Sequence, residues 1–187
     1  MSLAHATPRM TFDEFVVWSA AQERGRYELV DGEVVEMPSE GGLHNLVKGA
    51  VFRALQDASA RARFAGTVFT DGMTVRIDER HGREPDAAVT ATPVADLEAL
   101  SLVDPLIVVE VVSPSSERDD TGVKLLEYFS VPSIRHYLIV RPGEKAIVHH
   151  ARSESGDIRT SIVHGGEVRL DPPGLVLDAD HILTAGR

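Results

Sequence analysis

The chain has 187 residues, of which 43% are hydrophobic, enough to bury one globular domain but short for two. It has no cysteine, which excludes disulfides, thiolate zinc sites and cysteine nucleophiles and leaves Asp, Glu and His as the strong metal ligands. The net charge of -10 disfavours indiscriminate nucleic-acid binding. No apolar run approaches the ~20 residues of a membrane span, and residues 1–10 lack an apolar signal segment. We therefore expect a cytoplasmic protein without a membrane partner.

The first predicted elements are a short helix and a hairpin. Residues 11–14 form a capping box ahead of an apolar segment, which indicates a helix from about residue 12 to 22 with Trp18 in the core. Residues 26–37 are predicted as two strands around Asp31-Gly32, a dipeptide that favours a type I′ turn.

The next segment is the most regular amphipathic helix of the sequence. Apolar residues recur at spacings of three and four from 43 to 58, so this helix should pack on a sheet. His44 lies at its start, beside the apolar stripe, where it could reach a site on the sheet or remain in solvent. Residues 67–77, with a break at Asp71-Gly72, and residues 85–90 are predicted strands.

A carboxylate then interrupts an apolar strand. Residues 106–112 read Leu-Ile-Val-Val-Glu-Val-Val, a pattern typical of a strand covered on both faces. Ionising Glu110 there costs several kcal/mol unless a cation or hydrogen bonds compensate. Alternation along the strand places Glu110 on the same face as Val108 and Val112. Glu110 could simply be a buried acid paired with an arginine or backbone donors, but Asp86 opens the preceding strand, so we expect the two carboxylates to lie together.

The second half of the chain completes the predicted fold. A helix over 119–130 and a strand over 134–140 follow the Glu110 strand and make a βαβ crossover, and ligands bind beyond the carboxyl ends of such strands. Short strands separated by Gly and Asp turns follow. The predicted fold class is α/β, a mixed central sheet with flanking helices. One domain is expected, with a core of about 26–141 and a C-terminal antiparallel extension of about 145–183.

The order of these elements resembles the core of the PD-(D/E)XK nuclease superfamily. More narrowly, the chain resembles the Uma-type family of restriction-endonuclease-like proteins in Tyr27 to Glu33, His44, Pro85-Asp86, Glu110 to Ser115, Asp120 with Lys124, and Tyr137 to Val140. The match covers nearly the whole chain. It implies a restriction-endonuclease-like core, a divalent metal ion and DNA as the substrate.

The resemblance also assigns a lysine. The superfamily pattern places a lysine two residues after the acid, where this chain has Val112. The Uma-type resemblance implies that Lys124 on the following helix replaces it, and a helix packed on the sheet can project a long side chain over the strand end. Lys124 stands four residues after Asp120, so these two could instead pair with each other.

These observations define a candidate site and three functions. We expect Asp86 and Glu110 to bind Mg²⁺, with Mn²⁺ as the alternative, because oxygen-rich sites favour these ions. Lys124 would stabilise developing charge, and His44 would be an auxiliary ligand or proton acceptor. The first hypothesis is a metal-dependent endonuclease acting on DNA. The second, favoured by Val112 and the acidic charge, is a nuclease-like binding or assembly module that does not cut. The third is a carboxylate metal enzyme that hydrolyses a small phosphate ester.

The remaining polar residues receive simpler interpretations. Glu28 and Glu33 are expected to be solvated strand residues. His149-His150 are neighbours on a strand, so they point to opposite faces and cannot easily chelate one ion. Basic residues at 61–63 and 76–83 could form a local patch for nucleic acid. The sequence is compatible with a homodimer.

Overall fold

The computed structural model describes residues 9–112 and 121–186. The helices are α1 (Phe12–Ala20), α2 (Gly42–Ala62), α3 (Thr121–Ser130) and α4 (Ala179–Leu183). The strands are β1 (Tyr27–Val30), β2 (Glu33–Glu36), β3 (Val68–Thr70), β4 (Val75–Arg76), β5 (Gly82–Arg83), β6 (Ala87–Thr90), β7 (Pro105–Val111), β8 (His136–Arg141), β9 (Ala146–Arg152), β10 (Ile158–Val163), β11 (Glu167–Leu170) and β12 (Leu175–Asp178). The segment 113–120, which holds Asp120 and part of the family motif, lies outside the described residues.

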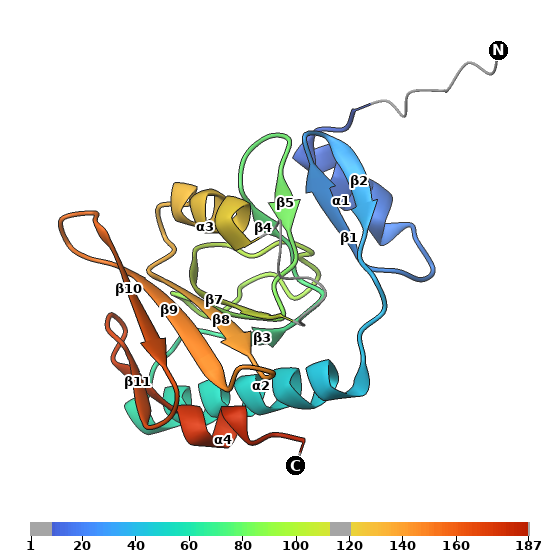
Figure 1. Cartoon of the computed structure of the whole chain (residues 1–187). Helices are drawn as coiled ribbons and strands as arrows, with labels where there is room; N and C mark the ends of the chain where they lie inside the picture. Colours follow the sequence, from blue (N-terminus) through green and yellow to red (C-terminus); the bar gives the residue numbers. More distant parts are fainter. Residues whose placement is uncertain (1–8, 113–120, 187) are drawn as a thin grey trace.

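A six-stranded mixed sheet forms the centre of the molecule (Figure 1). Its strand order is β10-β9-β8-β7-β6-β3. Strands β7 and β8 pair in parallel across α3, while β3-β6, β6-β7, β8-β9 and β9-β10 pair antiparallel. The predicted mixed sheet and βαβ unit are therefore confirmed.

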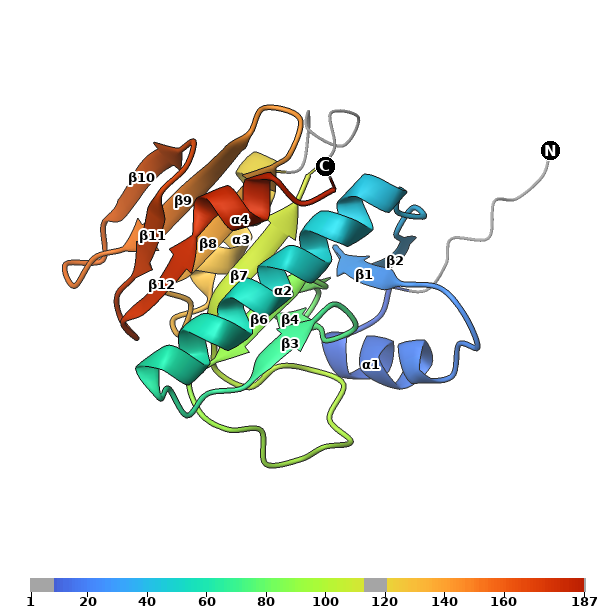
Figure 2. The ribbon, with the colours of Figure 1, turned by 90° about the horizontal axis from the view of Figure 1, so that it is seen from below.

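Helices cover both faces of this sheet, as the apolar run of β7 requires. Figure 2 shows α2 crossing one face, over β3, β6 and β7. Ile107, Val109 and Val111 share a buried cluster with α2, whereas Val108 belongs to the cluster beneath α3. This alternation, predicted from the sequence, places Glu110 on the α3 side of the sheet.

The N-terminal hairpin belongs to a second sheet with the order β2-β1-β5-β4. Asp31 and Gly32 have φ of 53° and 79°, the positive angles of a type I′ turn, which confirms that prediction. The Thr11 capping box is present. Helix α1 ends at Ala20, two residues earlier than expected, and the side-chain amide of Gln22 donates to the carbonyl of Trp18. Trp18 packs at the rim of the small α1–β1 core.

The predicted C-terminal antiparallel extension is continuous with the central sheet. Strand β9 pairs with β8 and carries β10 as the outer strand. The β11–β12 hairpin and α4 then cover α2, and their side chains at Leu170, Leu177 and Ile182 share its apolar cluster. None of the helices in the described residues is long and apolar enough to cross a membrane.

Candidate active site

Strand pairing brings Asp86 to the end of β7. In the antiparallel pairing of β6 with β7, Ala87 lies opposite Val109, so Asp86 directly precedes β6 beside the last residues of β7. Its Oδ2 accepts a hydrogen bond of 2.7 Å from the backbone N–H of Val111. Asp86 is only 3% exposed, and this backbone donor fixes its carboxylate at the strand end.

Glu110 is buried against α3. Lys124 Nζ donates to Glu110 Oε1 at 3.2 Å and Tyr128 Oη donates to the same oxygen at 2.7 Å. Within the described residues, Oε2 of Glu110 accepts no hydrogen bond. Burial raises the pKa of Glu110 to about 7, against the lowering effect of Lys124, while Asp86 and Glu28 raise it further. The carboxyl group is therefore poised to change protonation near neutral pH.

Lys124 lies where the sequence predicted it. Its side chain leaves α3 toward Glu110, and it is only 6% exposed. Val112, which occupies the superfamily's lysine position, lines the same cavity as Lys124. Lys124 thus points toward Glu110, as expected, and its role in place of the superfamily's lysine stays a prediction.

His44, in the first turn of α2, reaches the same site. Its Nε2 lies 3.1 Å from Asp86 Oδ1 and 3.5 Å from Glu40 Oε1. Glu40, His44 and Asp86 each place a potential ligand atom within 4.8 Å of the others. The sequence gives no signal for Glu40, because this residue precedes α2 in a loop without a periodic pattern.

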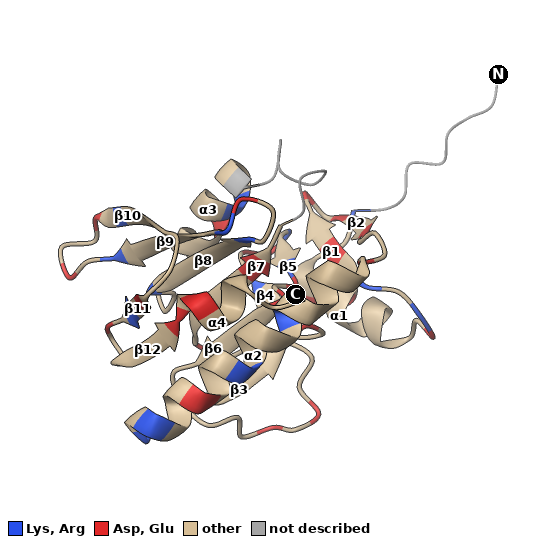
Figure 3. Cartoon of the chain, turned by 60° about the horizontal axis from the view of Figure 1, so that its bottom comes forward, with Lys and Arg blue, Asp and Glu red and all other residues tan. Residues whose placement is uncertain are grey.

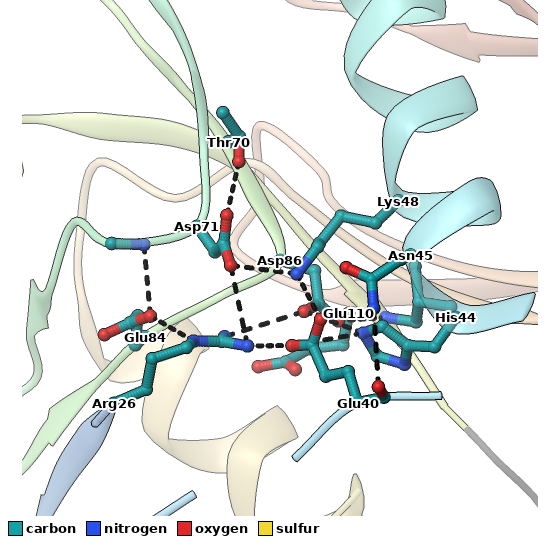
Figure 4. A network of polar contacts seen from close by, with 12 residues as sticks. Arg26, Glu40, His44, Asn45, Lys48, Thr70, Asp71, Glu84, Asp86 and Glu110 are labelled. Atoms are coloured by element: carbon teal, nitrogen blue, oxygen red, sulfur yellow. Dashed lines mark hydrogen bonds and ion pairs between the residues drawn. The ribbon is translucent and has the colours of Figure 1, made fainter. Parts of the chain in front are cut away.

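A second layer of charges surrounds Glu40 (Figure 4). Arg26 and Lys48 both form ion pairs with Glu40, and both also contact Asp71, at 3.5 Å and 2.8 Å. Burial opposes the charge of Arg26, but the surrounding carboxylates, led by Glu84, outweigh it and raise its pKa. Burial likewise opposes the charge of Asp71, and its contact with Lys48 outweighs burial and lowers its pKa. The acidic cluster thus contains its own cations.

These groups open into a cavity of about 290 Å³. Charged and titratable residues line one part of it: Glu28, Glu40, His44, Asp86, Glu110 and Lys124. Apolar residues form the remaining wall, among them Val35, Met37, Pro38 and Val112. Three segments that are distant in sequence, namely the end of β7, the start of α2 and the cavity face of α3, therefore meet at one cavity.

The expectation that Glu28 is solvated is wrong. Glu28 is 5% exposed, and it contacts Lys124 Nζ at 3.1 Å and Arg83 at 2.7 Å. Tyr27 and Leu29 pack with the α1 cluster, so alternation turns Glu28 to the other face of β1, toward the cavity. Glu33 is exposed, as expected.

The proposed basic patches do not gather at the cavity. Arg83 is 4% exposed and belongs to the buried network, so it is not part of a surface patch. Arg61 ends α2 and donates to the carbonyl of Val176, whereas His44 starts that helix, roughly 25 Å away along the axis. Figure 3 shows the basic residues of α2 spread along the helix, with the acidic Asp57 among them.

The histidines of β9 take separate partners, as alternation predicted. His149 Nε2 lies 2.9 Å from His136 Nδ1, and His150 Nδ1 lies 2.8 Å from the Thr160 hydroxyl. Burial lowers the pKa of both side chains, that of His149 to about 4. Neither histidine lines the cavity of Asp86 and Glu110.

The donor set fits a divalent cation. Asp86 and Glu40 supply carboxylate oxygens and His44 supplies an imidazole, with their potential ligand atoms within 4.8 Å of one another. Glu110 is not part of this cluster, but it lines the same cavity. The carboxylate oxygens suit Mg²⁺ and Mn²⁺, whereas an imidazole nitrogen is more typical of sites for later transition metals. The described residues at this site are therefore chemically competent to hold such an ion.

Comparison with known proteins identifies the family and the fold. Residues 12–182 match the Uma2 family, described as "Putative restriction endonuclease". Uncharacterized protein slr1290 of Synechocystis sp. (strain ATCC 27184 / PCC 6803 / Kazusa) is 25% identical over 153 residues, covering 80% of this chain and 78% of that protein. The crystal structure of a "putative nuclease belonging to DUF820" from Anabaena variabilis ATCC 29413 has a TM-score of 0.72 and 16% identity, covering 94% of this chain and 98% of that one.

Together these matches confirm the restriction-endonuclease-like fold expected from the sequence. Because the family match extends over nearly the whole chain, the protein belongs to the Uma2 family of restriction-endonuclease-like proteins.

Proposed function

We propose that this chain is a divalent-metal-dependent endonuclease that hydrolyses DNA phosphodiester bonds at the Asp86–Glu110 cavity. The observation that supports this most directly is the convergence of Asp86, Glu110 and Lys124 in that cavity, with His44 beside them. Carboxylates can hold the ion that metal-assisted phosphodiester hydrolysis uses, and a lysine ammonium can stabilise the charge that develops on the phosphate. Membership of the Uma2 family and the nuclease-like fold support the same reaction class.

Asp86 and Glu110 would hold the ion, and Glu40 or His44 would complete the donor set from the α2 side. Mg²⁺, or Mn²⁺ in its place, would supply positive charge that polarises the scissile phosphate and lowers the pKa of the attacking water. Tyr128 would keep Glu110 in place, because its hydroxyl donates to Oε1 and leaves Oε2 available for the ion.

Two side chains would handle charge and protons. Lys124 would place its ammonium near the phosphate and stabilise negative charge that develops there. Neutral His44, if it donates from Nε2 to Asp86, keeps Nδ1 as an acceptor, so it could take a proton from water.

One observation favours the second candidate, a nuclease-like binding or assembly module that does not cut. Arg26 and Lys48 already pair with Glu40 and Asp71, so part of the acidic cluster is neutralised without a metal ion. A site balanced by its own cations can persist as a structural network.

Cleavage assays separate these functions. Supercoiled plasmid and short single- and double-stranded DNA are incubated with Mg²⁺ or Mn²⁺, with calorimetric titration of each ion in parallel. The endonuclease predicts metal-dependent nicking by the wild type, lost in Glu110→Gln and Asp86→Asn and retained in Glu33→Gln, a matched control at an exposed acid.

The other outcomes identify the alternatives. Absence of both metal binding and cleavage would contradict the endonuclease and favour the module. Metal binding with hydrolysis of a small phosphate ester, but without salt-sensitive DNA affinity, would favour the small-substrate enzyme.

A further inference from the structure

A buried ion network lies behind the cavity and connects the hairpin to α3. Glu28 on β1 accepts from three groups: Arg83 at 2.7 Å through Oε2, and Lys124 at 3.1 Å and the backbone N–H of Glu84 at 3.3 Å through Oε1. Arg83 also donates to both oxygens of Glu127 on α3, at 2.7 Å and 3.0 Å. The network therefore contains Arg83 between two carboxylates and Lys124 between two carboxylates, with Glu28 common to both.

Arg83 supplies a permanent counter-charge to Glu28. Burial opposes the charge of Arg83, but Glu127 and Glu28 outweigh it and raise its pKa. Arg83 therefore gives Glu28 a hydrogen-bonded cationic partner that is independent of Lys124. The contact between Glu28 and Lys124 must therefore be explained by what it does to Lys124.

The geometry around Lys124 gives that explanation. A lysine side chain has several rotatable bonds, so an ammonium without directional contacts would sample many positions. Glu28 and Glu110 hold Nζ from two sides at 3.1 Å and 3.2 Å, and both carboxylates line the cavity with it. Glu110 comes from the central sheet and Glu28 from the separate hairpin sheet, so the ammonium is fixed at their junction.

We propose that Glu28 is a positioning residue that fixes the Lys124 ammonium beside Glu110 in the wall of the cavity. In this proposal Glu28 acts through Lys124, and not as a ligand of the metal ion or as a contact of the phosphate. Its effect on catalysis rests on the endonuclease function proposed above, whereas its effect on the order of the ammonium does not.

The network offers a matched pair of variants. Glu28→Gln and Glu127→Gln each remove one carboxylate charge from Arg83, but only Glu28→Gln removes the carboxylate that contacts Lys124. A purely structural role predicts the same consequences for both variants, whereas a positioning role predicts a difference confined to Lys124.

The test measures the order of the ammonium directly. NMR spectra of the ¹⁵N-labelled full chain report the exchange of the Lys124 ammonium protons with water, with the resonance assigned by its loss in Lys124→Arg. The expected result is faster exchange, or loss of the signal, in Glu28→Gln and a wild-type signal in Glu127→Gln. Equal exchange in the wild type and both variants, or an equal change in both variants, would overturn the proposal.

Kinetics provide the second readout. Glu28→Gln should lower kcat for metal-dependent DNA cleavage by about 10- to 100-fold, as expected when a charge-stabilising group is misplaced, with KM and the metal dissociation constant unchanged. Glu127→Gln should retain wild-type kcat. If the wild type does not cleave DNA, the endonuclease function fails, and the NMR comparison still decides whether Glu28 positions Lys124.

Thermal unfolding of both variants shows whether a change in ammonium exchange or in kcat comes only from loss of folding. Should Glu28→Gln fail to fold, Glu28→Asp retains the charge near Arg83 while shortening the reach toward Lys124, and it is measured in the same way. Wild-type ammonium exchange in a folded Glu28→Asp would also contradict the proposal.

Discussion

The ammonium of Lys124 lies 3.2 Å from Oε1 of Glu110, although the superfamily pattern has its lysine on the strand itself, at Val112. Helix α3 packs over the face of β7 that carries Glu110. This packing places the positive charge of Lys124 at the end of the strand, although Lys124 belongs to the helix. The candidate site therefore depends on the docking of α3 as well as on β7.

Removing that charge should affect both stability and activity. In Lys124→Ala, Glu110 loses a buried cationic partner, and breaking a buried pair by removing one member costs about 3–5 kcal/mol. The cost should be smaller at pH 5 than at pH 8, because Glu110, with its pKa raised to about 7, is protonated at the lower pH. Urea unfolding at the two pH values, together with the loss of cleavage, checks this prediction. Unchanged cleavage would show that Lys124 has no part in the chemistry.

Glu110→Gln should become more stable relative to the wild type as the pH rises. Burial raises the folded-state pKa of Glu110 from 4.5 to about 7, so the folded state binds more protons than the unfolded state between these values. The stability contributed by protonated Glu110 is complete below about 4.5 and is lost as the pH rises through about 7.

The glutamine variant lacks this titration. The difference in unfolding free energy, variant minus wild type, should therefore increase by about 3 kcal/mol between pH 4.5 and pH 8 in metal-free buffer. Chemical denaturation across this range measures it. A difference that stays flat or falls with pH would mean that ionised Glu110 is a net stabilising partner of Lys124.

Asp86→Asn should separate metal binding from folding. The amide oxygen can still accept a hydrogen bond from the backbone N–H of Val111. The free energy of unfolding of the variant should therefore lie within about 1 kcal/mol of the wild-type value. Loss of the carboxylate charge should weaken Mg²⁺ or Mn²⁺ binding by more than the roughly 10- to 100-fold that an outer-shell change costs.

Asp86→Ala provides the contrast. This change removes both the metal-binding charge and the acceptor for the backbone N–H of Val111. The variant should therefore also be destabilised by about 1–3 kcal/mol, because the backbone donor loses its buried partner. Calorimetric metal titration and thermal unfolding of the two variants check the separation. Wild-type metal affinity in Asp86→Asn would exclude Asp86 as a ligand.

Acid should destabilise the protein through the buried histidine pair on β8 and β9. Burial lowers the pKa of His149 from 6.5 to about 4, so the unfolded state binds more protons between these values. Stability is then lost as the pH falls from about 6.5 to about 4. His149→Gln can still donate to His136 and should lose about 1–2 kcal/mol less across this range, because the partial solvent access of this imidazole reduces the full effect of the shift.

The control for this prediction is His181→Gln, which changes an exposed histidine on α4. Its pH dependence should match that of the wild type when unfolding is followed by circular dichroism. Equal acid sensitivity in His149→Gln and the wild type would remove His149 as the cause.

Local features of the sequence determined much of the fold. The apolar alternation around Glu110 specifies a strand covered on both faces, and Asp31-Gly32 specifies a tight hairpin, because side-chain period and φ preference act within a few residues. The same reasoning placed Asp86 and Glu110 on neighbouring strands. His44 and Lys124 were identified by their resemblance to the family pattern, since neither stands out by periodicity.

Tertiary structure alone decided the partners of these groups. Glu28 looks like a solvated strand residue, and Arg83 like part of a surface patch, until the hairpin sheet packs against α3 and buries both. Glu40 and Arg26 likewise come together from separate loops. Periodicity shows which face a side chain occupies, but a buried charge is stabilised by a partner many residues away, and only the packed chain brings the two together.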